Sequence, residues 1–132
     1  MLRTDLAASL RDRFEDDGFL FPDYDGYCFA NVPGAVASLL GADAGRSLPA
    51  DTFDGVDTDG VETVLVVLVD GFGWAQWRRE RTHHGFLDRL TAAARVTPLT
   101  SIYPSETAAA ITTFHTGALP AKHGVVGWNV HD

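Results

Sequence analysis

Apolar side chains near the start of the chain follow helical spacing. Leu6, Leu10 and Phe14 recur every four residues, which places them on one face of a helix. The pattern predicts this helix over residues 4–17, and Gly18 directly after it is a typical helix end. The buried face would pack against the rest of the chain.

A second short helix and a long connection follow. The segment 32–40 is apolar and helical in pattern, with Asn31 as its expected cap, Pro33 in its first turn and Gly41 after its end. Residues 41–60 are rich in Gly, Asp and Pro and show no period, which is typical of a surface linker.

The hydrophobic pattern changes at residue 62. Residues 63–69 read Thr-Val-Leu-Val-Val-Leu-Val, a β-branched run without polar alternation. Such a run favours a strand covered on both faces, as in a parallel sheet. The run stops at Asp70-Gly71, at what would be the carboxyl end of that strand.

Further helices and strands are predicted to alternate after this run. Apolar spacing favours helices near residues 74–81 and 86–94, and residues 95–102 form a second strand candidate that Pro98 interrupts. Residues 106–116, closed by Gly117, complete the pattern with a well-marked helix. This order predicts an α/β layered fold, a mostly parallel sheet with flanking helices.

Charge divides the chain into two zones. Residues 1–62 carry 13 acidic and four basic side chains, a balance of −9, whereas residues 63–132 carry five acidic and six basic ones, a balance of +1. The acidic zone would repel phosphate, which disfavours nucleic acid and anionic membranes as partners. Of the 18 acidic residues 14 are Asp, and Lys122 is the only lysine, so we expect a halophilic source.

The cysteine count and the hydropathy bear on the compartment. Cys28 is the only cysteine, so it can form no intramolecular disulfide, and we expect it to be a small buried side chain. The N-terminal residues lack the apolar core of a signal peptide, and the run at 64–69 is far too short to span a membrane. The expected location is the cytoplasm.

Two side chains could carry chemistry. Asp70 would lie at the sheet edge where α/β folds bind ligands, as a candidate metal ligand, although it could equally cap the following turn. Thr107 lies in the first turn of the helix near residues 106–116, where free N–H groups attract phosphate. A threonine hydroxyl needs a base or a metal to become a nucleophile, and on its own Thr107 is better explained as a helix-surface residue.

Three motifs that follow one another along the chain favour a chemical role for Asp70 and Thr107. The segments VLVVLVDG at 64–71, YPSETAAAITTFHTG at 103–117 and HGVVGWN at 123–129 resemble the type I phosphodiesterase/nucleotide pyrophosphatase family of the alkaline phosphatase superfamily. The resemblance covers about residues 62–130. The sequence departs from the family's Phe-Pro-Asn-His after the threonine, with Ala-Ala-Ala-Ile at 108–111, which leaves the substrate class open.

The resemblance implies an enzyme that hydrolyses phosphate esters with two divalent metal ions, usually zinc. It implies that Asp70 is a metal ligand and that Thr107 is the metal-bound nucleophile, which would form a phosphothreonine intermediate. Asn129 would donate a hydrogen bond to a phosphoryl oxygen. His123 matches a family position too, and we expect it to order its loop rather than to bind metal.

The family's remaining Asp and His ligands come from positions that would lie beyond residue 132, so the complete ligand set is not expected in this chain. We therefore expect an acidic leader at 1–61, followed at 62–132 by the N-terminal part of an alkaline-phosphatase-like domain that is incomplete at its C-terminus. The 132 residues alone should be inactive, and an uncovered sheet edge should let copies associate. A truncated, non-catalytic interaction module and a phosphomutase or sulfatase-like member of the superfamily remain alternatives.

Overall fold

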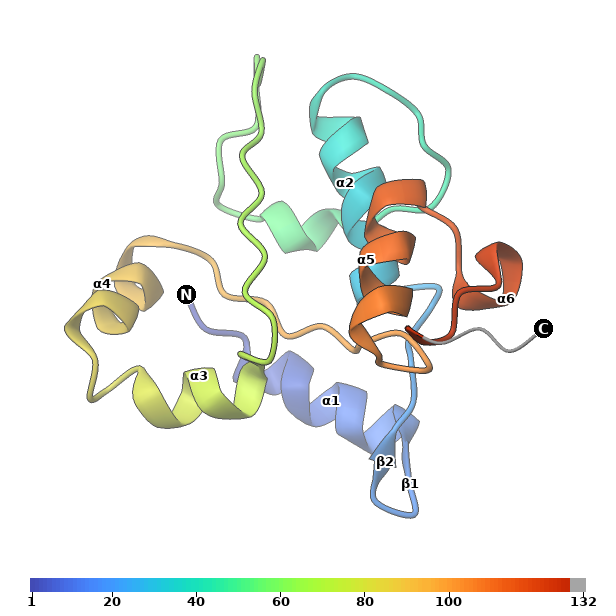
Figure 1. Ribbon diagram of the computed structural model, residues 1–132. Coiled ribbons are helices and arrows are strands. Elements are labelled where there is room, and N and C mark those ends of the chain that lie inside the picture. Colours follow the sequence, from blue (N-terminus) through green and yellow to red (C-terminus); the bar gives the residue numbers. More distant parts are fainter. Residues whose placement is uncertain (129–132) are drawn as a thin grey trace.

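A computed structural model describes residues 1–128 of the chain. It combines helices with one small antiparallel sheet and is an α/β structure (Figure 1). The helices and strands are, in chain order, α1 (Thr4–Phe14), β1 (Glu15–Asp16), β2 (Phe19–Leu20), η1 (Phe29–Asn31), α2 (Val32–Leu39), η2 (Ala50–Phe53), α3 (Trp74–Glu80), α4 (Gly85–Ala93), α5 (Thr107–Thr116) and α6 (Pro120–His123).

The first helix is shorter than its pattern predicts. Leu6 and Leu10 are buried on one face of α1 as expected, but α1 ends at Phe14 and residues 15–20 form the hairpin β1–β2. The turn of the hairpin places Asp17 and Gly18 at positive φ angles, 47° and 79°. Gly18 adopts this conformation without strain, so it marks a hairpin turn rather than a helix end.

The main core lies between the leader and α5. Cys28, Ala30, Ile102 and Ala109 form a buried cluster, and α2 packs beside α5 in the right half of Figure 1. Cys28 is fully buried, as predicted, and burial raises the pKa of its thiol.

Asn31 has a different role from the predicted one. It occupies the N-cap position of α2, but its side chain makes no capping bond. Its amide nitrogen Nδ2 instead donates to the carbonyl oxygens of Tyr24 (3.1 Å) and Gly26 (2.6 Å). This fully buried side chain therefore stabilises the loop that precedes it.

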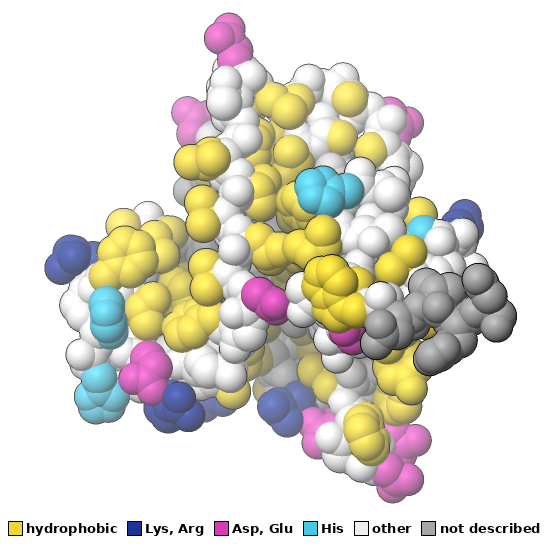
Figure 2. All heavy atoms as spheres, viewed as in Figure 1, with side chains coloured by type: hydrophobic (Ala, Val, Ile, Leu, Met, Phe, Trp, Pro, Cys, Tyr) yellow, Lys and Arg dark blue, Asp and Glu magenta, His cyan; other side chains and the backbone are white. Residues whose placement is uncertain are grey.

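The predicted parallel sheet is not present among residues 1–128. Residues 63–69 form no strand and run as an irregular segment, with Leu65 86% and Val67 75% exposed. A strand needs neighbours that pair with its main chain, and no described segment supplies them. Figure 2 shows hydrophobic side chains at the surface along this segment.

The expected association of copies through an uncovered sheet edge stays a prediction, and so does the division of the chain between residues 61 and 62.

The second strand candidate is reduced to two single contacts. Val96 bridges to Leu2 and Thr100 bridges to Cys28, and both bridges are parallel. Residues 95–102 therefore lie along the leader, not beside residues 63–69 in the predicted sheet, and they form no ladder. The helices α3, α4 and α5 lie close to their predicted ranges, and Gly117 ends α5 at a φ angle of 66°.

Within the described part of the chain, no helix combines the length and the hydrophobicity that a membrane span requires.

Candidate functional site

A cleft of about 480 Å³ opens where the exposed apolar segment meets the start of α5. Asp70 and Gly71 line one side of it, and Ser105 and Thr107 line another. Its further lining residues are Phe29, Leu68, Val69, Phe72, Gly73, Gln76, Leu99, Thr100, Ser101, Ala110 and Ile111. The two side chains singled out from the sequence thus face one cleft.

Thr107 and Asp70 contact each other directly. The Thr107 hydroxyl Oγ1 donates a hydrogen bond to Asp70 Oδ2 at 3.0 Å, although 37 residues separate the two. Asp70 is exposed and Thr107 is half-buried. The carboxylate orients the hydroxyl and lies within reach to take its proton, which is the relation that an activated nucleophile requires.

The start of α5 fixes the backbone at Thr107. Thr107 is the first residue of the helix, and Glu106 before it accepts a hydrogen bond from the Ala108 N–H at 2.9 Å. This cap stabilises the first turn, where the positive end of the helix dipole lies beside the Thr107 side chain. The helix therefore holds the hydroxyl at a place suited to a phosphoryl group.

The described residues of the cleft could supply only part of the ligands that a metal ion needs. Asp70 and Thr107 offer two oxygen donors 3.0 Å apart, whereas zinc in proteins takes about four ligands. Among residues 1–128 no cluster of three or more His, Cys, Asp or Glu side chains could hold a metal ion. The donors present therefore fit two ligand positions but not a complete two-metal site.

The leader supports the cleft, a connection that the sequence did not indicate: Phe29 lines it, and the lining residue Thr100 is hydrogen-bonded to the leader. Thr100 donates from its N–H (2.8 Å) and from Oγ1 (3.1 Å) to the carbonyl of Tyr27. Its Oγ1 also accepts from the Asp23 N–H at 2.9 Å, and its carbonyl accepts from the Phe29 N–H at 2.9 Å. These contacts join segments more than 70 residues apart, and no local pattern in the sequence signals them.

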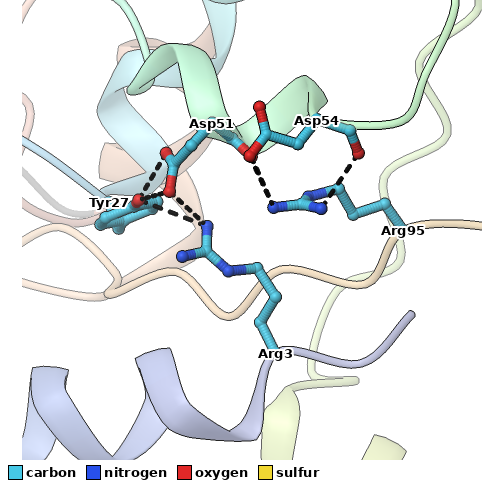
Figure 3. Close-up of polar contacts among 5 residues, drawn as sticks. All are labelled: Arg3, Tyr27, Asp51, Asp54 and Arg95. Atoms are coloured by element: carbon cyan, nitrogen blue, oxygen red, sulfur yellow. Dashed lines mark hydrogen bonds and ion pairs between the residues drawn. The ribbon is translucent and has the colours of Figure 1, made fainter.

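A polar cluster apart from the residues that line the cleft joins the leader to Arg95 (Figure 3). The Tyr27 hydroxyl lies 2.5 and 2.6 Å from the two carboxylate oxygens of Asp51, to which it donates, and Arg3 pairs with Asp51 at 2.9 Å. Arg95 donates to the Asp51 carbonyl at 2.6 Å and to that of Asp54 at 3.0 Å. The cluster thus ties the N-terminus and η2 to residue 95.

Three pKa values in this cluster are shifted, and that of the Arg3 guanidinium is raised, mainly by its hydrogen bond with Tyr27. The hydrogen bond from Tyr27, with the charge of Arg3, holds the pKa of the Asp51 carboxyl below its ordinary value. Burial, with the hydrogen bond to Asp51, raises the pKa of the Tyr27 hydroxyl. The shifts of Asp51 and Tyr27 favour the pair as drawn, a neutral phenol that donates to a carboxylate.

His123 has the structural role expected of it. Its Nδ1 accepts from the Val125 N–H at 3.0 Å, and its Nε2 lies 3.0 Å from the hydroxyl of Thr113 on α5. In the neutral imidazole this leaves Nε2 as the donor to Thr113. The ring therefore links α5 to the loop after α6. Asn129, the expected phosphoryl-binding residue, lies outside the described residues.

The second half of the chain is similar to a known protein family. Residues 64–132, more than half of the chain, match the family model described as type I phosphodiesterase / nucleotide pyrophosphatase. Neither the curated proteins nor the solved structures that were compared gave a significant match. The match begins at the exposed apolar run and includes both Asp70 and Thr107.

Proposed function

Because this chain belongs to the type I phosphodiesterase / nucleotide pyrophosphatase family, whose hydrolases act on phosphate esters, we propose that Thr107 is the nucleophile of such a reaction and that Asp70 is a metal ligand. The observation that carries the proposal is the 3.0 Å hydrogen bond from Thr107 to Asp70 inside the cleft.

The proposed reaction proceeds in two displacements. Thr107 Oγ1 passes its proton to Asp70 Oδ2 and attacks the phosphorus atom, the bond from phosphorus to the leaving oxygen breaks with its electron pair on that oxygen, and a phosphothreonine forms; the proton then passes from Asp70 to the leaving oxygen. Asp70 orients the hydroxyl before attack, and the N-terminal end of α5 faces the negative phosphoryl oxygens. Attack of water on phosphorus then breaks the bond to Oγ1 and frees the threonine.

A divalent cation, zinc by the family resemblance, would take Asp70 and Thr107 as ligands and would supply Lewis acidity that lowers the pKa of the threonine hydroxyl. The remaining ligands would have to come from outside the described residues. We therefore propose that the 132-residue chain binds the metal weakly and turns over no substrate by itself. Asn129 remains the proposed donor to a phosphoryl oxygen.

Metal binding gives the first test, because it needs no turnover. Zinc is titrated into the 132-residue chain in which both His83 and His84 are changed to Ala, since two adjacent histidines could bind zinc themselves. In this background Asp70→Asn should weaken binding by about 10-fold or more, because a charged ligand is lost. The matched control Asp88→Asn, an exposed carboxylate on α4, should change affinity by less than about 2-fold.

Activity gives the second test. The chain, and any longer product read from the same gene, are assayed with bis(p-nitrophenyl) phosphate and with p-nitrophenyl phosphate in the presence of zinc. Where turnover is seen, Thr107→Ala should lower it by at least about 1,000-fold. Turnover that survives Thr107→Ala contradicts the proposed nucleophile. A preference for the monoester would favour a phosphomutase-like or other member of the superfamily over a phosphodiesterase.

A further inference from the structure

Tyr24 of the leader contacts the main chain just before the proposed nucleophile. Its hydroxyl accepts a hydrogen bond from the Tyr103 N–H at 3.0 Å and donates to the Tyr103 carbonyl at 3.4 Å. One side chain thus satisfies both polar groups of one residue, 79 positions later in the sequence. Tyr103 cannot hold this place through its own side chain, which is 69% exposed.

Tyr24 is itself firmly held. Its ring packs against the buried cluster that contains Cys28, Ile102 and Ala109. Its carbonyl accepts from Asn31 Nδ2 at 3.1 Å and also from the Arg46 guanidinium. These contacts fix the position of the Tyr24 hydroxyl. Its two hydrogen bonds to Tyr103 therefore fix the main chain of Tyr103 relative to the core of the leader.

Only three residues separate Tyr103 from Thr107, and this short connection leads straight into the first turn of α5. A shift of the connection would move the Thr107 hydroxyl relative to Asp70, which lies on the exposed segment and is not held by the leader core. Because proton transfer and in-line attack depend on the placement of the nucleophile to within about 1 Å, such a shift would matter for the reaction.

We propose that Tyr24 is a positioning residue for Thr107: its hydroxyl holds Tyr103 and thereby sets the distance from the Thr107 hydroxyl to Asp70. This inference rests on the proposed function for its catalytic meaning, but its geometric content can be tested without substrate or metal. It gives the leader, which lies outside the family match, a direct part in the construction of the site.

The variant Tyr24→Phe removes the hydroxyl and keeps the ring in the core. Its matched control is Tyr27→Phe, which removes the other tyrosine hydroxyl of the leader, the one bonded to Asp51 away from the cleft. A merely structural role predicts similar effects of both variants on the site. The proposal predicts an effect at the cleft from Tyr24→Phe alone.

The readout is the carboxyl ¹³C signal of Asp70 in the metal-free chain, which reports the hydrogen bond from Thr107. Thr107→Ala marks the signal position when the bond is lost. In Tyr24→Phe the signal should move toward that position, and in Tyr27→Phe it should remain at the wild-type position. An unmoved signal in Tyr24→Phe, or an equal movement in Tyr27→Phe, overturns the proposal.

A second measurement needs no variant. In the wild-type chain the Tyr103 amide should exchange its hydrogen at least about 10-fold more slowly than an exposed, unbonded amide, because it donates to Tyr24. Unprotected exchange there contradicts the inference. If Asp70→Asn leaves zinc affinity unchanged, the proposed metal role fails, while the Asp70 signal and the Tyr103 exchange still decide the role of Tyr24.

Discussion

The leader and the segment that follows it are built in opposite ways. The leader carries most of the buried side chains, among them Leu6, Leu10 and Asn31, and no residue proposed to react. Residues 61–97, by contrast, contain no buried side chain, and neither α3 nor α4 buries a residue. Yet this exposed stretch is where the family match begins and where Asp70 lies.

The proposed site forms where these two regions meet. Asp70 comes from the exposed stretch, whereas Thr107 begins α5, which packs against the leader. One partner of the pair thus has a rigid support and the other does not. The comparison teaches that the two side chains proposed to react come from the family motifs, while contacts that place Thr107 come from residues outside the match.

The largest expected difference between the regions is in core packing. Leu10→Ala should lower the free energy of unfolding by about 3 kcal/mol, because Leu10 is 2% exposed and its loss leaves a cavity. Leu65→Ala, the same change at an 86% exposed position, should stay within about 0.5 kcal/mol. Urea unfolding of both variants measures the difference, and equal losses would show that the segment at 63–69 is covered in solution.

A smaller effect is expected from the polar cluster of the leader. Asp51→Asn should lower stability by about 1 kcal/mol near neutral pH, a modest value because the Asp51 carboxylate is 40% exposed and solvent screens it. Since the folded state holds the pKa of Asp51 below 3.8, its contribution is present above that pH and is lost as the pH falls through the lower, folded value.

Acid unfolding of the wild type and of Asp51→Asn measures this dependence. The wild type should lose stability more steeply below about pH 4 than the variant does. Asp88→Asn, which removes an exposed carboxylate of the other region, serves as the control. At the alkaline end the raised pKa of Tyr27 works the other way, because its contribution is lost as the pH rises through the folded value.

The smallest effect concerns charge. The leader's excess of Asp should make the fold more stable as KCl rises from about 0.1 M to about 2 M, because salt screens carboxylate repulsion. Asp57→Asn with Asp59→Asn, both exposed, should reduce this gain by a few tenths of a kcal/mol, and Asp88→Asn should not. Stability that is independent of salt would contradict the proposed halophilic adaptation.

Most of the helices are predictable from the sequence, whereas the strands are not. Helix ranges near residues 32–40, 74–81 and 106–116 follow from apolar spacing, and Gly117 ends α5 in the left-handed conformation that glycine permits. The strand at 63–69 is not formed, because a strand depends on partners that a local pattern cannot show to be present. The hairpin at 15–20 is missed for a related reason, since helix and hairpin turn share Gly18 as a signal.

The sequence predicts Asp70 and Thr107 as candidate site residues, because both belong to motifs whose order resembles the type I phosphodiesterase family. It does not predict the residues that support them. Tyr24, Asp23 and Thr100 have ordinary residue types at unremarkable spacing, and their roles arise only from contacts 77 to 79 positions apart. Such contacts depend on how the whole chain closes, which periodicity and composition do not encode.

The bond between Tyr24 and Tyr103 also has a consequence for the order of folding. Closing a loop of 79 residues costs chain entropy before any contact compensates for it, so we expect this contact to form late. During synthesis the partners of the Tyr24 hydroxyl and of the Asp23 N–H are not yet present, so both groups bond to water until residues 100–103 have left the ribosome. Helix α1 and the hairpin can form before then. On the proposed role of Tyr24, the Thr107 hydroxyl takes its final position only after residues 100–103 have bound to the leader.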